Sequence, residues 1–104
     1  MSSMSSAVWR IIKDIKPTDS RVRILGRIIE ANKNYIVIDD GTGLILVDTT
    51  GVERKTLLEY VLVIGEVHQK TGNKLIIEAE LITSFKYVNM EIYHKTYNLV
   101  KAQR

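Results

Sequence analysis

Cysteine is absent from this 104-residue sequence, which also has only one proline and two histidines. The absence of cysteine excludes disulfide bonds, cysteine-ligated zinc and a thiol nucleophile, and it fits a reducing compartment. No apolar run approaches the roughly 18 residues needed to cross a bilayer. The first six residues, MSSMSS, lack the basic flank and the apolar centre of a signal peptide. We therefore expect an intracellular protein, from the cytoplasm, nucleoid or nucleus, that does not bind membranes.

Recognisable catalytic motifs are also missing. His68 and His94 lie in different predicted elements and lack a metal-binding spacing such as His-x-x-x-His. No phosphate-binding Gly-x-x-x-x-Gly-Lys-Ser/Thr motif occurs, and the run DDGTG at 39–43 has too few carboxylates for a calcium loop. Catalysis needs acids, bases, nucleophiles or metals that converge on one pocket. The sequence therefore predicts a protein that is not an enzyme and that needs no cofactor or metal.

The composition fits one globular domain, because 45% of the residues are hydrophobic and 26% are charged. Residues 1–6 are small and polar, which predicts a disordered tail. The apolar spacing in residues 7–19 fits a short helix or an extended segment, which Pro17 should end. The net charge of +3 is too small to identify a nucleic-acid-binding protein, so the positions of the charged residues must show whether the chain binds nucleic acid.

Apolar and polar residues alternate in five segments, as half-buried strands require. The predicted strands cover residues 21–30, 35–39, 44–48, 60–67 and 74–81. Gly26 and Gly65 lie in the middle of the first and fourth strands, where a strongly coiled strand leaves no room for a side chain. Residues 49–59 predict a short helix or an irregular plug, and helical spacing begins at residue 88.

Three meandering strands, a linking segment and two further strands are the element order of a Greek-key barrel. A five-stranded sheet of this size leaves two edges exposed unless it closes on itself, and bent strands favour glycine. We therefore predict an all-β, five-stranded OB-fold barrel over residues 20–84, followed by a C-terminal α-helix within residues 85–104.

Three segments of this barrel carry a family resemblance: VRILGRII at 22–29, YIVIDDGTG at 35–43 and YVLVIGEV at 60–67. They resemble the OB domain of the middle subunit of replication protein A and of related Stn-type single-stranded-DNA-binding and telomere-capping proteins. The resemblance covers roughly residues 20–100. It implies binding of single-stranded DNA in replication and repair, and a helix after the barrel that joins subunits through a helix bundle.

OB domains bind single strands across the outer face of their second and third strands, flanked by the loops that join strands one to two and four to five. On this basis the predicted nucleic-acid-binding residues are Arg21, Arg23, Arg27, Lys33, Asn34, Tyr35, His68, Lys70 and Lys74. The alternative is ordinary surface charge, with a cross-strand packing role for Tyr35. Glu66, Glu78 and Glu80 could pair with the same arginines. With one stacking residue and about four or five phosphate contacts, isolated binding should be weak and should depend steeply on salt.

The C-terminal helix is predicted to carry apolar residues over more than half of its circumference. The first stripe consists of Val88, Ile92 and Leu99, and the second of Met90, Tyr93, Tyr97 and Val100. A helix packed on its own barrel needs one such face. The other face indicates either a partner helix or tyrosine rings that shield it within the chain.

Together these features predict a non-catalytic subunit of a complex similar to replication protein A. Its expected partners are single-stranded DNA, with RNA as an alternative ligand, and other OB-fold subunits bound through the C-terminal helix. The competing hypothesis is an OB-fold adaptor that binds proteins and has little direct contact with nucleic acid.

Overall fold

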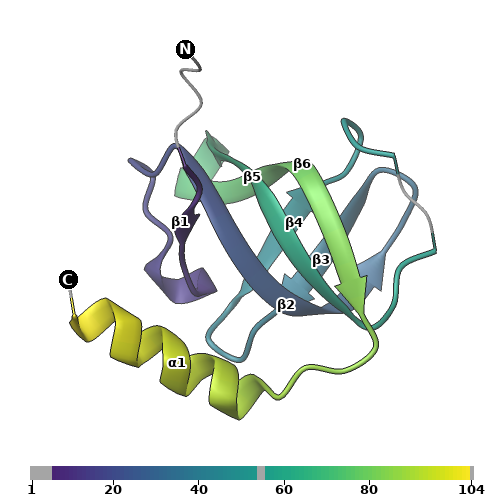
Figure 1. Cartoon of the computed structure of the whole chain (residues 1–104). Helices are drawn as coiled ribbons and strands as arrows, with labels where there is room; N and C mark the ends of the chain where they lie inside the picture. Colours follow the sequence, from purple (N-terminus) through teal and green to yellow (C-terminus); the bar gives the residue numbers. More distant parts are fainter. Residues whose placement is uncertain (1–5, 54–55, 104) are drawn as a thin grey trace.

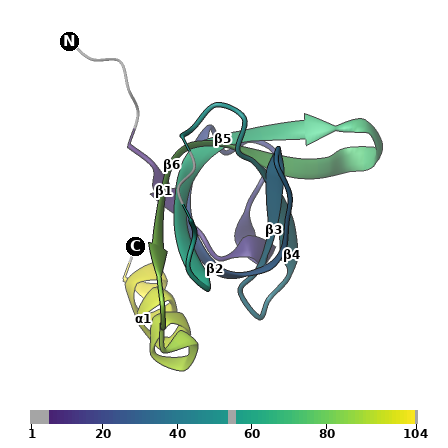
Figure 2. The same ribbon diagram turned by 90° about the vertical axis from the view of Figure 1, so that its right-hand side faces the viewer.

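A computed structural model describes residues 6–53 and 56–103 of the chain. Five strands close into a barrel (Figures 1 and 2): β2 (Arg21–Ala31), β3 (Tyr35–Asp39), β4 (Leu44–Asp48), β5 (Tyr60–Lys70) and β6 (Lys74–Phe85). The strand order is β2-β3-β4-β6-β5, and a β2–β5 pairing closes the ring. The β4–β6 pair is parallel, whereas the other four barrel pairings are antiparallel. This arrangement confirms the predicted OB fold.

The N-terminal segment adds two short elements to this barrel. A two-residue strand, β1 (Val8–Trp9), runs parallel to the start of β2, and a 3-10 turn, η1 (Ile12–Asp14), follows it. Ile12 and Ile15 join the barrel core. Of the predicted tail, only Ser6 belongs to the described residues, and it is exposed.

The barrel core consists of the inward positions of the alternating strands, as the period of two requires. The side chains of Val22, Ile24, Ile36, Ile38, Val47, Val61, Val63 and Ile77 have no exposed surface. Of the predicted plug, residues 49–53 and 56–59 contain no helix, but Val52 and Leu57 pack against the core. The described part of that segment therefore acts as an irregular plug.

A buried carboxylate connects the N-terminal segment to the β3–β4 turn. Asp40 is 2% exposed, accepts a hydrogen bond from the Ile12 backbone N–H at 2.7 Å and accepts two more from the N–H and hydroxyl of Thr42. Gly41 has φ +88° in this turn, a conformation that favours glycine. The DDGTG run thus has a structural role in the barrel.

Helix α1 (Met90–Ala102) follows the barrel and lies on the side of β1 and η1 (Figure 1). The Asn89 side chain caps its first turn by accepting a hydrogen bond from the Ile92 N–H. In residues 6–53 and 56–103, no helix is both long and apolar enough to cross a membrane.

Candidate nucleic-acid interface

The outer face of β3 and β4 has an apolar patch that borders a hollow, with Asp39 and Asp48 at the ends of the two strands. Val37 lies opposite Leu46 across the ladder, and Leu44 lies opposite Asp39. The hollow has a volume of about 460 Å³ and is lined by Ile12, Ile15, Val37, Leu44, Ile45, Leu46, Lys74 and Leu75. Apolar walls suit the faces of nucleic-acid bases, and a lysine among them suits a phosphate.

The turn between β2 and β3 forms one border of this face. Lys33 and Asn34 are exposed there, and Tyr35 begins β3 directly opposite Asp48. The Tyr35 hydroxyl donates a hydrogen bond to Glu30 Oε2 at 2.9 Å, and this bond raises the pKa of Tyr35. The tyrosine ring is therefore fixed at the edge of the apolar face.

The β5–β6 hairpin forms the opposite border and projects beyond the barrel on the side of β3 and β4 (Figure 2). Lys70 and Lys74 face each other across its end, and both are exposed. Lys74 also lines the hollow. Lys70 contributes to the lowered pKa of Asp48 on β4, whose main cause is hydrogen bonding to the Thr50 backbone and side chain. Both lysines thus belong to the surface that surrounds the hollow.

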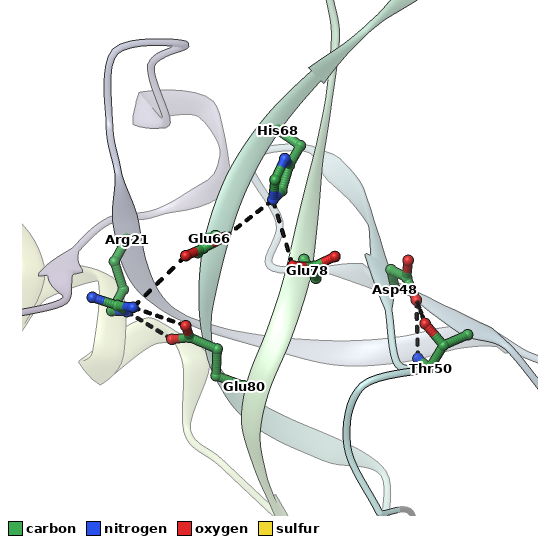
Figure 3. A network of polar contacts seen from close by, with 7 residues as sticks. All are labelled: Arg21, Asp48, Thr50, Glu66, His68, Glu78 and Glu80. Carbon is green, nitrogen blue, oxygen red and sulfur yellow. Dashed lines mark hydrogen bonds and ion pairs between the residues drawn. The ribbon is translucent and has the colours of Figure 1, made fainter. Parts of the chain in front are cut away.

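The three predicted arginines occupy the outer side of β2, where they pair with other parts of the chain. Arg21 donates to both oxygens of Glu80, at 2.6 and 2.8 Å (Figure 3), and its side chain is only 13% exposed. The guanidinium of Arg23 lies 5.7 Å from the centre of the Trp9 ring.

Arg27 Nε lies 2.8 Å from Glu59 Oε2 in an exposed ion pair. The β2–β5 register places all three arginines beside β5, but Arg27 also lies directly opposite Asp39 of β3. Arg21 pairs with two of the three predicted glutamates, Glu80 and Glu66, so this arginine is already neutralised within the chain.

His68 lies at the base of the hairpin between two carboxylates. Its Nε2 atom is 3.3 Å from Glu66 Oε1 and 3.7 Å from Glu78 Oε1. The local charge around this histidine is therefore acidic, which disfavours a phosphate at the same point.

The apolar residues of α1 divide into an inner and an outer group. Tyr97 is 3% exposed, packs edge-on against Trp9 and donates to Asp14 Oδ2 at 2.9 Å. The Tyr93 hydroxyl accepts a hydrogen bond from Trp9 Nε1 at 2.7 Å. Burial is the main cause of the raised pKa of both tyrosines.

Tyr93 and Tyr97 therefore pack within the chain, which differs from their predicted place on a partner interface. The outer group consists of Ile92, Leu99 and Val100, whereas Val88 and Met90 are half-buried.

Sequence reasoning recognised Val37, Leu44 and Leu46 as outward residues but left them out of the predicted site. It missed Leu75 and the N-terminal isoleucines of the hollow. The sequences of β3 and β4 could have indicated that Val37, Leu44 and Leu46 belong to a site, because both strands put apolar residues on their outer face as well as on their inner face. No sequence signal pairs residue 12 with residue 75, since only the closed barrel brings them together.

The comparisons with known proteins support the fold. No protein family and no curated protein matches the sequence. A chain in the structure of the S. pombe Stn1–Ten1 complex has a TM-score of 0.76 at 19% identity, and the match covers 94% of each chain. The S. pombe telomere capping protein Ten1 has a TM-score of 0.74 at 19% identity, with 93% of this chain and 99% of that chain covered.

A chain of U. maydis replication protein A bound to single-stranded DNA has a TM-score of 0.64 at 20% identity, covering 79% of this chain and 76% of that one. Such identities establish similarity of fold. The chain has an OB fold that resembles Ten1, Stn1 and replication protein A subunits, as the resemblance in the sequence predicted.

Proposed function

We propose that this chain is a non-catalytic, single-stranded-DNA-binding OB subunit that binds DNA across the outer face of β3 and β4. The observation that carries the proposal is the apolar hollow of about 460 Å³ with exposed lysines on the adjoining hairpin. Bases stack or pack on the apolar face, and Lys33, Lys70 and Lys74 neutralise phosphates at its two borders. Structural neighbours that include replication protein A bound to single-stranded DNA support the same ligand class.

The internal pairing of Arg21 lowers the expected affinity. With about three lysine contacts at about 0.7 each, the logarithm of the binding constant should fall with the logarithm of salt concentration with a slope near −2. A single domain with so few contacts binds weakly, so useful affinity requires other OB domains in the same assembly.

The test is a fluorescence anisotropy titration of labelled oligo-dT at several salt concentrations. The double variant Lys70→Gln/Lys74→Gln should bind more weakly and should lose about 1.4 from the salt slope, which is two contacts at about 0.7 each. The control Lys86→Gln/Lys95→Gln removes the same charge from exposed positions outside the proposed face. Equal losses in the two variants would reduce the effect to net charge and overturn the proposed face. Absence of binding at low salt would exclude direct contact with DNA.

RNA is the alternative ligand, because a groove that reads stacked bases and phosphates does not by itself exclude a 2′-hydroxyl. Competition between oligo-dT and oligo-rU for the wild-type chain decides between them. Preference for DNA supports the proposal, and preference for RNA replaces DNA with RNA as the ligand.

A second candidate function is an adaptor that binds an OB-fold partner through α1. Ile92 and Leu99 favour it, because they are 60% and 66% exposed and lie on the same side of the helix. Ile92→Asp/Leu99→Asp should abolish binding to an OB partner, while the control Glu91→Gln/Lys95→Gln should retain it. A partner that binds the aspartate variant equally well would rule out this surface. Loss of partner binding with unchanged oligo-dT binding would separate the two roles.

A further inference from the structure

A histidine and two glutamates meet on the outer face of β5 and β6, at the base of the hairpin (Figure 3). Glu66 and Glu78 are directly opposite in the antiparallel ladder, and His68 lies two residues beyond Glu66. Residues two apart on a strand point to the same face. The fold therefore brings one imidazole and two carboxylates together from two strands.

The spacing of the three ligand atoms fits a small divalent cation. All three lie within 4.8 Å of one another, and His68 Nε2 is 3.3 and 3.7 Å from the two carboxylate oxygens. Zinc bonds of about 2.0–2.2 Å in a tetrahedron put neighbouring ligand atoms about 3.3–3.6 Å apart. The 3.3 Å separation of Nε2 from Glu66 Oε1 lies within this range, and the 3.7 Å separation from Glu78 Oε1 is slightly longer.

The direction of the imidazole is a second observation. His68 Nε2 is buried from solvent and makes no hydrogen bond to any described residue, although Glu66 Oε1 is 3.3 Å away. Its lone pair or N–H is therefore not aimed along the line to that oxygen. Ligands of a metal converge on a point between them, so a ligating nitrogen does not point at its neighbours.

The electrostatic surroundings also favour a cation. Two glutamates directly opposite on one face repel each other. Arg21 reaches Glu66 only at 3.9 Å, because its short contacts are to Glu80. On the other side, Asp48 adds further negative charge and is held by Thr50 (Figure 3). Among the described residues, the cationic groups that reach the opposed glutamates are thus Arg21, at 3.9 Å from Glu66, and His68, if it is protonated.

We propose that Glu66, His68 and Glu78 form a binding site for a divalent transition metal of the zinc type. One nitrogen and two carboxylate oxygens bind the ion, and water completes its coordination. An imidazole in the set favours zinc, cobalt or nickel over magnesium and calcium, which prefer all-oxygen sites. The bound ion cross-links β5 to β6 at the base of the hairpin, and it has no assigned part in a reaction.

A proton is the competitor for the same position, because imidazole binds a metal only through a free lone pair. In that case His68 forms ion pairs with Glu66 and Glu78 and no metal is needed. The two alternatives predict different responses to added zinc, so they can be distinguished directly.

The test is isothermal titration calorimetry of the full, tag-free chain with zinc chloride near neutral pH. We expect one zinc ion per chain with a micromolar dissociation constant, and weakening of at least about tenfold in each of His68→Ala, Glu66→Gln and Glu78→Gln. The matched controls are His94→Ala and Glu91→Gln, which should bind zinc as the wild type does. Cobalt should give a visible absorption spectrum that His68→Ala lacks.

A measurement on the unaltered chain avoids any dependence on how the variants fold. In NMR spectra, zinc should shift the His68 ring signals in proportion to occupancy and leave those of His94 in place. The metal site would be overturned in favour of the ion pair if zinc showed no saturable binding up to about 1 mM. It would also be overturned if a folded His68→Ala variant bound zinc as tightly as the wild type. The result is independent of the DNA proposal, because oligo-dT titrations can be run in the presence of a chelator.

Discussion

Replacing Gly65 with alanine should destabilise the barrel, because β6 passes too close to leave room for a side chain. A Cβ atom at this position would lie 2.8 Å from Ile77 Cγ2 and 2.9 Å from the carbonyl carbon of Glu78, and it would be closer still to the Glu78 oxygen. Two of these atoms are backbone and are fixed by the β5–β6 ladder, which has a register shift at this point. The two strands must therefore move apart.

The size of the effect follows from a comparison with a second glycine. Overpacking of this kind costs about 1–3 kcal/mol. Any glycine-to-alanine change also gains about 0.4–1 kcal/mol by restricting the unfolded chain. Gly51→Ala obtains this gain without a clash, because its nearest atom, Ala79 O, would be 3.8 Å from the new Cβ. Since the gain is common to both variants, their difference is about 1–3 kcal/mol, and the backbone obstacle favours the upper end.

Urea unfolding followed by far-UV circular dichroism and by Trp9 fluorescence measures this difference. Gly26→Ala should fall between the other two variants, because its Cβ would lie 3.2 Å from side-chain atoms of Ile38. A Gly65→Ala free energy of unfolding within about 0.5 kcal/mol of the Gly51→Ala value would refute the close approach of β6.

Two further predictions concern the polar contacts that hold the N-terminal segment. Hydrogen bonds from Arg10 are the main cause of the lowered pKa of Asp19. The ionised carboxylate therefore stabilises the fold above its unfolded pKa of about 3.9. This stabilisation is lost as the pH falls through the lower pKa of the folded state. Asp19→Asn should lower the free energy of unfolding at pH 7. Between pH 7 and pH 2, the urea midpoint of this variant should fall less than that of the wild type. Tyr97→Phe removes the hydroxyl that donates to Asp14 and keeps the ring, and it should cost about 0.5–1.5 kcal/mol of unfolding free energy in the same assay. Unchanged Trp9 fluorescence would show that the ring remains in place.

The barrel was predictable because local patterns determine most of it. Ile36 and Ile38 alternate with half-buried neighbours, as in the sequence, and both are fully buried. The alternating pattern also drew attention to the mid-strand glycines. Position 65 requires glycine because the β6 backbone approaches it closely, and not only because β5 bends there. Irregular residues 49–53 and 56–59 could not be assigned, since apolar spacing alone does not separate a short helix from a plug.

The candidate site was less predictable, because periodicity gives the face of a residue but not its lateral neighbour. Arg21 points outward as expected, yet only the β2–β5 and β5–β6 registers bring it to Glu80. The same limit applies to α1. Two apolar stripes were visible, but the contact of Tyr97 with Trp9 joins residues from opposite ends of the chain and decides which stripe faces the barrel.

The position of the hairpin lysines depends on the base of the hairpin rather than on its tip. Beyond Val67, which still packs on the core, residues 69–74 are exposed and are held by strand pairing and a hydrogen bond between Gln69 and Asn73 at 2.8 Å. Exposed ladders without a core beneath them open easily. The course of the hairpin is therefore set at its base, four residue pairs below Lys70 and Lys74, where Glu66 and Glu78 face each other. A metal at the proposed site would therefore hold β5 to β6 at the base from which the two lysines project.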